Sequence, residues 1–153
     1  MTFLVYEMIF SGNLKESSRI SCIPFEERYF QTYMPIYNAC FYDMRKALEI
    51  EPYEYLHAYE QIREKSKDIF LMLDDGEIIG SVACYENEVD DLIVNPKFCG
   101  KGYGKQLLLW AMEHIRSRGY DEISLHVADW NRHALQMYQR AGFEIFRTET
   151  IQR

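Results

Sequence analysis

The sequence predicts a single α/β domain in which helices interrupt a largely antiparallel sheet. Its 153 residues suit one domain built around one hydrophobic core. Short runs rich in β-branched and aromatic residues alternate with segments whose apolar residues recur every three or four positions, which indicates strands and helices in turn. No repeat, low-complexity tract or linker divides the chain.

The N-terminal half is predicted to contain two strands and two helices. Residues 2–10 and 19–25 are β-rich, and the polar stretch between them indicates a loop. Apolar side chains follow a helical period in residues 26–48, where Pro35 is expected to kink or split the helix. A second helix is expected over residues 53–65.

The C-terminal half opens with a predicted hairpin. Residues 69–73 and 77–85 are expected to be strands on either side of Asp74-Asp75-Gly76, because an Asp-Gly pair between two apolar runs is a strong hairpin signal. The next expected strand covers residues 89–94.

A helix, a strand, a further helix and a last strand are expected to follow. The first of these helices ends at Gly119, and the strand covers residues 123–127. Asn131 is expected to begin the second helix and Gly142 to stop it, before a last strand over residues 143–151.

The composition indicates which classes of protein this chain can belong to. Hydrophobic residues make up 48% and charged residues 27% of the chain, as in ordinary soluble globular proteins. No apolar run reaches the roughly 18 residues that cross a bilayer, and no signal-peptide pattern is present, so no membrane contact is expected. The four cysteines are scattered and show no Cys-x-x-Cys spacing, which predicts neither a metal site nor a disulfide framework and favours the reducing cytoplasm. The net charge of −7 argues against nucleic acid and is compatible with cationic small substrates.

A glycine-rich loop is the strongest functional signal. Gly100, Gly102 and Gly104 lie between a predicted strand and a predicted helix, with Lys101 and Lys105 among them. Glycines let the backbone turn sharply and approach a ligand closely, while the start of a helix presents free N–H groups and positive potential. The loop fits neither the Walker A pattern nor the dinucleotide fingerprint, yet it predicts a site for a phosphate group.

Two segments resemble the GNAT family of acetyl-CoA-dependent N-acetyltransferases. VDDLIVNPKFCGKGYGKQLL is similar to the family's acyl-CoA-binding motif, a strand followed by Q/R-x-x-G-x-G/A. NRHALQMYQRAGF is similar to its N-x-x-A-x-x-x-Y-x-x-x-G-F segment. One position departs from the family: Cys99 stands where Gln or Arg is usual, which puts a side-chain contact to the cofactor in doubt.

The resemblance implies a strongly bent sheet whose fourth and fifth strands splay apart to hold acetyl-CoA. The backbone of Leu92 and Val94 is then expected to bind the pantetheine arm, and the amides between Gly100 and Lys105 the pyrophosphate. The residues expected to bind the cofactor are Leu92, Val94, Cys99, Gly100, Lys101, Gly102, Tyr103, Gly104, Lys105 and Asn131.

The resemblance also implies catalytic candidates. An alkylamine is almost entirely protonated at neutral pH, so its acetylation requires a general base. Tyr138 is the expected proton donor to the departing thiolate. Glu88, His126 and Asp90 are the alternatives for the base, with the neighbouring Asp91 as a further acid. Glu88 and Asp90 share a face with Leu92 and Val94 unless a bulge intervenes.

The acceptor is expected to be the primary amine of a small molecule or a peptide. Eight of the 12 tyrosines precede residue 60, interleaved with acidic residues; the resemblance implies that this region forms the acceptor wall, which would suit an ammonium group. The competing interpretation is that these tyrosines only cover the sheet with their hydroxyls in water. The alternative is a non-catalytic domain that binds acyl-CoA or a partner protein.

The N-terminal strand is expected to compensate for a missing one. GNAT domains usually end with two strands after the second motif, but only ten residues follow Phe143. Residues 2–10 are expected to fill the vacant slot beside residues 123–127 or to extend an adjacent edge, within one subunit or by exchange in a homodimer. The competing interpretation is a simple hairpin with residues 19–25.

Overall fold

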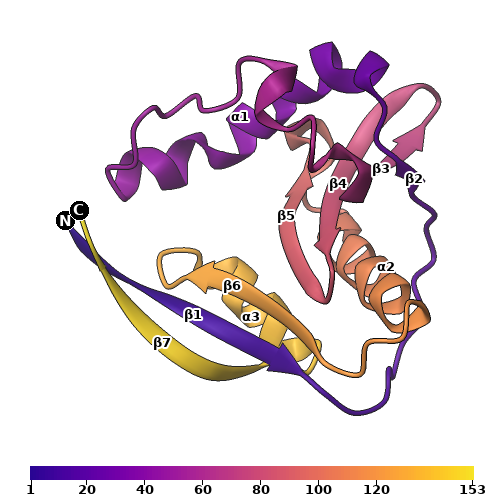
Figure 1. Ribbon diagram of the computed structural model, residues 1–153, viewed down its shortest axis with the longest axis vertical. Helices are drawn as coiled ribbons and strands as arrows, with labels where there is room; N and C mark the ends of the chain where they lie inside the picture. The colour runs from indigo at the N-terminus through magenta and orange to yellow at the C-terminus, as the bar shows by residue number, and fades with distance from the viewer.

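The computed structural model describes all 153 residues and contains one mixed sheet of seven strands (Figure 1). The strands are β1 (Thr2–Phe10), β2 (Ile23–Pro24), β3 (Ile69–Asp74), β4 (Glu77–Tyr85), β5 (Glu88–Val94), β6 (Ile123–Ala128) and β7 (Glu144–Gln152). They lie in the order β2-β3-β4-β5-β6-β1-β7, and every neighbouring pair is antiparallel except β5 and β6. The predicted α/β class with a largely antiparallel sheet is confirmed.

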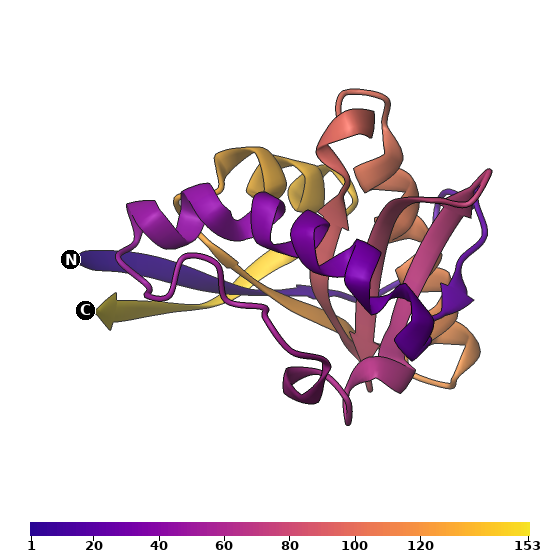
Figure 2. The same cartoon turned by 90° about the horizontal axis from the view of Figure 1, so that it is seen from above.

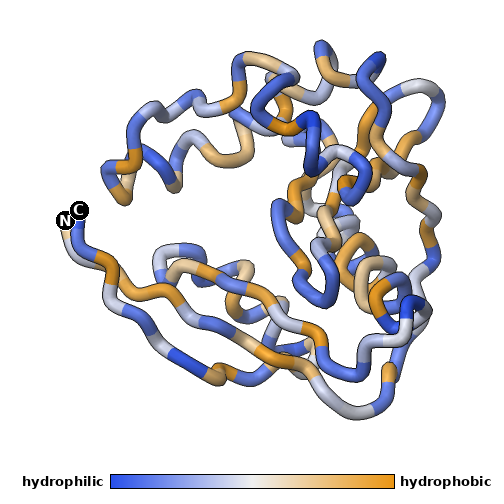
Figure 3. Tube along the Cα trace, in the orientation of Figure 1, coloured by the Kyte–Doolittle hydropathy of each residue, from blue (hydrophilic) through white to orange (hydrophobic).

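Three α-helices cover the two faces of this sheet (Figures 1 and 2). They are α1 (Phe30–Ala47), α2 (Tyr103–Ser117) and α3 (Arg132–Arg140). Alternate residues of β4 belong to different cores, because Val82 packs with α2 and α3 whereas Ala83 packs with α1. Figure 3 shows hydrophilic and hydrophobic residues alternating along β6, which has one face on the α2–α3 core. None of the helices is long and apolar enough to cross a membrane.

The N-terminal strand fills the slot beside β6 within its own subunit. Glu7 of β1 pairs with His126 of β6 on one side and with Arg147 of β7 on the other. Met8 is fully buried in the core beneath α2 and α3. The hairpin between residues 2–10 and 19–25 is therefore wrong, and β1 is an interior strand of the sheet.

The strand expected over residues 19–25 is reduced to the two residues of β2, which pair with β3. Just before β2 the chain lies against α2. The N–H of Ser18 donates to the carboxylate of Glu113, and the N–H of Arg19 donates to Oε1 of Gln106 at 2.7 Å. Since side chains of α2 hold these backbone groups, they do not join the sheet.

The helix expected over residues 53–65 is also wrong. The segment contains only the short η2 turn (Tyr59–Gln61), and the η3 turn (Ser66–Asp68) follows it. Asn38 of α1 binds both backbone groups of Leu56, accepting from its N–H at 2.9 Å and donating to its carbonyl at 2.7 Å. A helix would need those same backbone groups for itself, so the side chain of Asn38 prevents it.

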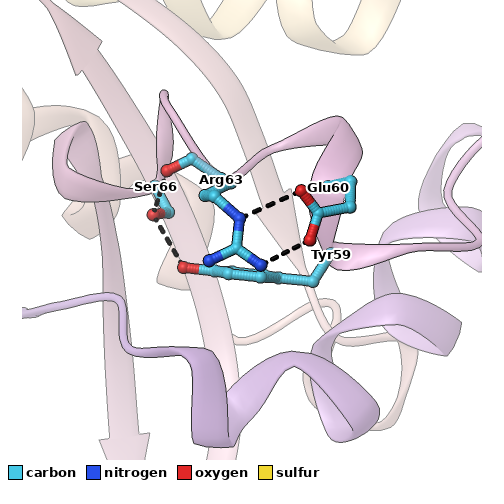
Figure 4. Close-up of polar contacts among 4 residues, drawn as sticks. All are labelled: Tyr59, Glu60, Arg63 and Ser66. Atoms are coloured by element: carbon cyan, nitrogen blue, oxygen red, sulfur yellow. Dashed lines mark hydrogen bonds and ion pairs between the residues drawn. The ribbon is translucent and has the colours of Figure 1, made fainter.

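Contacts among side chains of residues 59–66 fix the conformation of the rest of this segment (Figure 4). The guanidinium of Arg63 pairs with Glu60 and lies 4.9 Å from the centre of the Tyr59 ring. The hydroxyl of Ser66 donates to the carbonyl of Arg63 at 2.8 Å and lies 3.2 Å from the hydroxyl of Tyr59. These contacts form a compact turn that leads directly into β3.

The helix α1 continues through Pro35, so the expected split does not occur. Proline removes one N–H donor from the helix interior. Phe30 and Tyr33, on the preceding turn, are 4% and 1% exposed and anchor the helix on the sheet. Their packing outweighs the loss of a single hydrogen bond.

The strands β5 and β6 separate after a short contact. Only two residue pairs join them, Glu88 with Ser124 and Val89 with Leu125. Beyond Val89 the two halves of the sheet diverge, as Figure 1 shows between β5 and β6. The splayed central strands implied by the sequence are thus present.

A bulge in β5 lies just beyond this contact. Ser81 of β4 pairs with Ile93, but Ala83 pairs with Asp90, so β5 has one residue more than β4 over this interval. Asp91 lies within the bulge at φ +44°, in the left-handed region that aspartate tolerates better than most residues.

The bulge reverses which side chains share a face of β5. Val89 belongs to the core under α2 and α3, whereas Ile93, four residues on, belongs to the core under α1. Glu88 consequently faces away from Leu92 and Val94, both of which border the α2–α3 core. The simple alternation expected along this strand is therefore wrong.

Candidate active site

A cleft of about 940 Å³ lies where the two halves of the sheet diverge. Its walls come from the end of β5, the loop and first turn of α2, one side of α3, the second half of α1 and the loop after β1. This volume falls in the range of small-molecule and cofactor sites. Most of the lining is apolar, with a few polar groups gathered at the glycine-rich end.

After β5 the chain turns toward the glycine-rich end of the cleft, and hydrogen bonds hold this turn in place. Asn95 is buried; its side chain donates to the carbonyl of Ile78 at 3.0 Å and accepts from the N–H of Lys97 at 3.1 Å. The η4 turn (Pro96–Phe98) follows. The residues that follow the strand are thereby held at the mouth of the cleft.

The glycines then place the start of α2 against the cleft. Gly100 and Gly102 have φ values of +81° and +84°, which other residues adopt only with strain. The first backbone hydrogen bond of α2 runs from Gln106 N–H to the carbonyl of Gly102 at 3.3 Å. The preceding N–H groups therefore have no helical acceptor, and the helix dipole makes this end positive. Such an arrangement can bind a phosphate group.

A close approach at Gly80 keeps this helix tight against the sheet. A Cβ there would lie 2.5 Å from the carbonyl oxygen of Ile93 and 2.7 Å from Cδ1 of Leu107. Both are closer than real Cβ contacts, so only glycine fits between β4, β5 and α2.

Cationic side chains surround the glycine-rich end. Lys105 lines the cleft and pairs with Glu16 at 3.0 Å, while Lys15 and Arg140 line it from the loop after β1 and from α3. Lys101 does not line the cleft; its Nζ lies 5.6 Å from the centre of the Phe98 ring. Sequence reasoning missed Lys15 and Arg140, because no local pattern indicates that their segments meet here.

Asn131 lies where β6 leads into α3. Its side chain accepts a hydrogen bond from the N–H of Ala134 at 3.2 Å and so caps the helix, as predicted. Asn131 and the preceding Trp130, which is 44% exposed, both line the cleft. The cap thus fixes where α3 begins relative to the opening.

Tyr138 reaches the cleft from α3. The side chain is 9% exposed, and its ring packs edge-on against Phe143 with centroids 6.1 Å apart. Burial raises the pKa of the hydroxyl to about 12, and the charge of Asp90 adds to the rise. The hydroxyl is therefore protonated at neutral pH and can donate a proton rather than accept one.

Asp91 is the carboxyl group whose surroundings raise its pKa well above the ordinary value. It is half-buried at the bulge, and desolvation raises the pKa of its carboxyl to about 7, with a further contribution from Asp90 and a smaller one from Glu88. Lys65 opposes the rise. The carboxyl therefore exchanges its proton near neutral pH, as a general base must.

Three tyrosines share the electrostatic field of Asp91. Burial raises the pKa values of Tyr33 and Tyr37 on α1 and of Tyr85 on β4, and Asp91 adds to each rise. The hydroxyl of Tyr85 is buried without a hydrogen-bond partner. The carboxylates at the bulge thus contribute to raised tyrosine pKa values on three elements, α3, α1 and β4.

The other two predicted bases form a pair of their own. Nδ1 of His126 lies 2.7 Å from Oε2 of Glu88, across the short contact of β5 and β6. The two side chains are 51% and 32% exposed, and neither lines the cleft. Glu7 of β1 is the cross-strand neighbour of His126, so this pair faces an open, acidic part of the sheet.

The structure thus brings together nearly all the residues expected at the cofactor site. The predicted residues that line the cleft are Leu92, Val94, Cys99, Gly100, Gly102, Tyr103, Gly104, Lys105, Asn131 and Tyr138. Lys101 and the predicted bases Glu88, His126 and Asp90 lie outside its lining, and so does Asp91. The contribution of α1 was missed, because no sequence signal indicated that Cys40, Phe41 and Met44 reach the cleft.

Comparison with known sequences shows that this chain is similar to acetyltransferases. A model of the acetyltransferase (GNAT) family matches residues 30–143. An uncharacterized N-acetyltransferase of Methanocaldococcus jannaschii is 26% identical, over 92% of this chain and 64% of the relative. The mycothiol acetyltransferase of Thermobifida fusca is 35% identical, over 52% of this chain and 22% of the relative. The chain therefore spans less than two thirds of the length of either relative.

Solved structures share the fold at low sequence identity. An acetyltransferase of the GNAT family from Colwellia psychrerythraea has a TM-score of 0.74 and is 16% identical, over 98% of this chain and 55% of that chain. A PaiA N-acetyltransferase from Thermoplasma acidophilum, solved in complex with coenzyme A, has a TM-score of 0.65 and is 21% identical, over 85% of this chain and 92% of that chain.

The raised pKa of Asp91 predicts a pH-dependent penalty on folding. Between the ordinary carboxyl pKa, near 4, and about 7, the folded chain holds this proton and the unfolded chain does not, so stability falls as pH rises. Asp91→Asn removes the titrating group and tolerates a positive φ. Urea unfolding at pH 5 and pH 8 should show the variant gaining roughly 1–3 kcal/mol over the wild type across that interval.

Asp121→Asn, at an exposed position, is the matched control and should follow the wild type at both pH values. An Asp91→Asn variant with the same pH dependence as the wild type would show that this carboxyl ionises normally in the folded chain.

Proposed function

Because the chain belongs to the GNAT family of acetyltransferases, we propose that it transfers the acetyl group of acetyl-CoA to a primary amine of a small molecule or peptide. The observation that carries the proposal is the cleft at the divergence of β5 and β6, which combines a phosphate-binding helix start with a protonated tyrosine. The activated acetyl group is supplied by the thioester of acetyl-CoA. The chain has to bind that molecule and move two protons.

The residues of the cleft fit a long phosphorylated thioester. The free N–H groups at the start of α2, with Lys105 beside them, suit the pyrophosphate. Leu92 and Val94 line the apolar part, where β5 has no strand partner on the β6 side and its backbone can bind the pantetheine arm. Since these contacts use backbone groups, Cys99 at the usual Gln or Arg position is compatible with binding.

Tyr138 is the proposed proton donor to the departing thiolate. Its hydroxyl is protonated at neutral pH, as that of an ordinary tyrosine with a pKa near 10 is, and burial raises the pKa further to about 12. A coenzyme A thiolate resembles a cysteine thiolate with a pKa near 8.5, so a nearby hydroxyl donor favours its departure.

Asp91 is the proposed general base, in preference to the candidates that the sequence favoured. Its pKa of about 7 is matched to proton removal near neutral pH. Its neighbour in the chain, Leu92, lines the cleft, and Asp90 acts on Tyr138. The Glu88–His126 pair is the alternative, supported by its 2.7 Å contact at the point where β5 and β6 part.

The surroundings of Asp91 support an ammonium-bearing acceptor. Tyr37 and Tyr85 are half-buried aromatic side chains within the field of a carboxylate, and aromatic rings and carboxylates both attract an alkylammonium ion. The unpaired hydroxyl of Tyr85 offers a further polar contact.

Acetylation assays test the proposal directly. The protein is incubated with acetyl-CoA and a panel of polyamines, amino acids, aminoglycosides and N-terminal peptides, and products are identified by mass spectrometry. The proposal expects a monoacetylated amine and free coenzyme A. Tight binding of acetyl-CoA with no product and no hydrolysis across the panel would support a non-catalytic acyl-CoA-binding domain instead.

Two substitutions of Gly104 should show whether a bulky side chain in the glycine loop blocks binding of coenzyme A. A Cβ at this position would lie 3.5 Å from Sδ of Met137 and 3.8 Å from Cγ2 of Val94, which are ordinary contacts. Gly104→Ala should therefore bind coenzyme A within about threefold of the wild type. Gly104→Leu extends into the cleft and should weaken binding at least tenfold, or about 1.4 kcal/mol, by calorimetry. Equal affinity in both variants would remove the loop from the binding site.

Removal of the Tyr138 hydroxyl should slow turnover without loosening the cofactor. Tyr138→Phe keeps the packing against Phe143 and deletes only the proton donor. The turnover number should fall on the order of 100-fold, while the dissociation constant for coenzyme A changes little. Tyr42→Phe, outside the cleft, is the control. A Tyr138→Phe enzyme with wild-type turnover would exclude the acid role.

The pH profile identifies the base. If Asp91 removes the proton, kcat/KM rises with pH around a midpoint near 7, and Asp91→Asn loses this acidic limb together with about 100-fold or more in rate. Glu88→Gln and His126→Gln should keep the limb. Loss of the limb in either of those variants, with its survival in Asp91→Asn, would assign the base to the Glu88–His126 pair.

A further inference from the structure

Two cysteine thiols of the cleft lie near the same backbone carbonyl oxygen. Sγ of Cys40, on α1, lies 3.2 Å from the carbonyl oxygen of Val94, and Sγ of Cys99 lies 3.8 Å from the same atom. The sulfurs can be no further apart than the sum of these distances, 7.0 Å. Both residues line the cleft, and α1 packs directly against β5 and the η4 turn that precedes Cys99.

The two thiols differ in accessibility. Cys99 is exposed, so an oxidant reaches its sulfur from solvent. Cys40 is half-buried; burial raises the pKa of its thiol to about 11, and the nearby Cys99 adds to the rise. A solvent-accessible thiol beside a second, shielded one is the arrangement in which the first is oxidised and the second resolves it.

The other two cysteines lie outside the cleft. Cys84 is buried in the core under α2 and α3, and Cys22 packs at the edge of that core. Burial raises the pKa of each thiol to about 12, and Cys84 contributes to the raised pKa of the Cys22 thiol. They serve as internal references for the reactivity of the cleft pair.

We propose that Cys40 and Cys99 are a redox site whose disulfide blocks the acyl-CoA cleft, an inference that rests on the proposed function. A peroxide oxidises the Cys99 thiolate to a sulfenic acid and is itself reduced, releasing hydroxide. The sulfur of Cys40 then attacks the sulfenic sulfur, the S–S bond forms, and water leaves with the thiol proton. Two thiols and one hydrogen peroxide thus give one disulfide and two waters.

The bond would change the cleft where the pantetheine arm is expected. A disulfide requires the sulfurs to come within about 2.05 Å, so the residues must draw together beside Val94. This movement takes the Cys40 thiol away from the Val94 carbonyl and ties α1 to the loop that carries the glycines. By reciprocity, bound coenzyme A should make the disulfide less favourable at equilibrium by the same coupling that lets the disulfide oppose binding. Because it would also occupy the cleft between the two thiols and solvent, it should slow their oxidation.

Peptide mapping and binding measurements test the inference together. The intact protein is treated with an equimolar amount of hydrogen peroxide, alkylated and digested without reduction. A linked peptide containing Cys40 and Cys99, lost after dithiothreitol, is the expected product, and saturating coenzyme A should slow its appearance. Oxidation should weaken coenzyme A binding at least tenfold by calorimetry, and dithiothreitol should restore it.

Single cysteine substitutions test whether both Cys40 and Cys99 are required for the response to peroxide. Cys40→Ser and Cys99→Ser should form no linked peptide, and peroxide should leave the affinity of each close to its own reduced value. Cys22→Ser is the matched control and should respond to peroxide as the wild type does.

The outcomes separate this inference from the proposed function. A protein that binds coenzyme A but yields only sulfinic or sulfonic acid at Cys99, or forms the disulfide with unchanged affinity, overturns the redox control alone. A reduced protein that does not bind coenzyme A overturns the proposed function and the regulatory role together.

Discussion

The separation of β5 from β6 is the constraint on which the rest of the site depends. Two residue pairs hold the strands together, and beyond Val89 each half of the sheet follows its own direction. The bulge at Asp91 begins where this pairing ends, so the backbone of Leu92 and Val94 is left without a neighbour on the β6 side. Unpaired backbone beside an apolar cleft is a binding surface in itself, because such groups need partners.

Different groups lie on the two sides of the sheet around this divergence. The α2–α3 side carries the helix start and Tyr138, which line the cleft and, under the proposed function, would hold the thioester. The α1 side carries Tyr37, which is affected by the charge of Asp91; under the proposed function this side would receive the amine. β1 secures this arrangement by occupying the position between β6 and β7, where it is paired with a strand on each side.

Features encoded within a few consecutive residues could be predicted from the sequence. The hairpin at Gly76, the helix cap at Asn131 and the glycine loop have local signals, and the structure contains all three. Features that depend on distant partners could not. The side chain of Asn38 replaces an expected helix by binding the backbone of Leu56, and no pattern in either segment reveals that contact. The bulge likewise depends on how β5 pairs with β4, so the unusual position of Asp91 emerges only in three dimensions.

The central claim is that the cleft between the diverging strands binds the acyl donor through backbone groups. Amide resonances of the ¹⁵N-labelled protein during titration with coenzyme A test it most directly. The account predicts that the largest shifts fall on the N–H groups from Gly100 to Gln106 and on Leu92 and Val94, with little change in β2 and β3. Saturable binding with shifts confined to other regions, and none in the glycine loop, would contradict it.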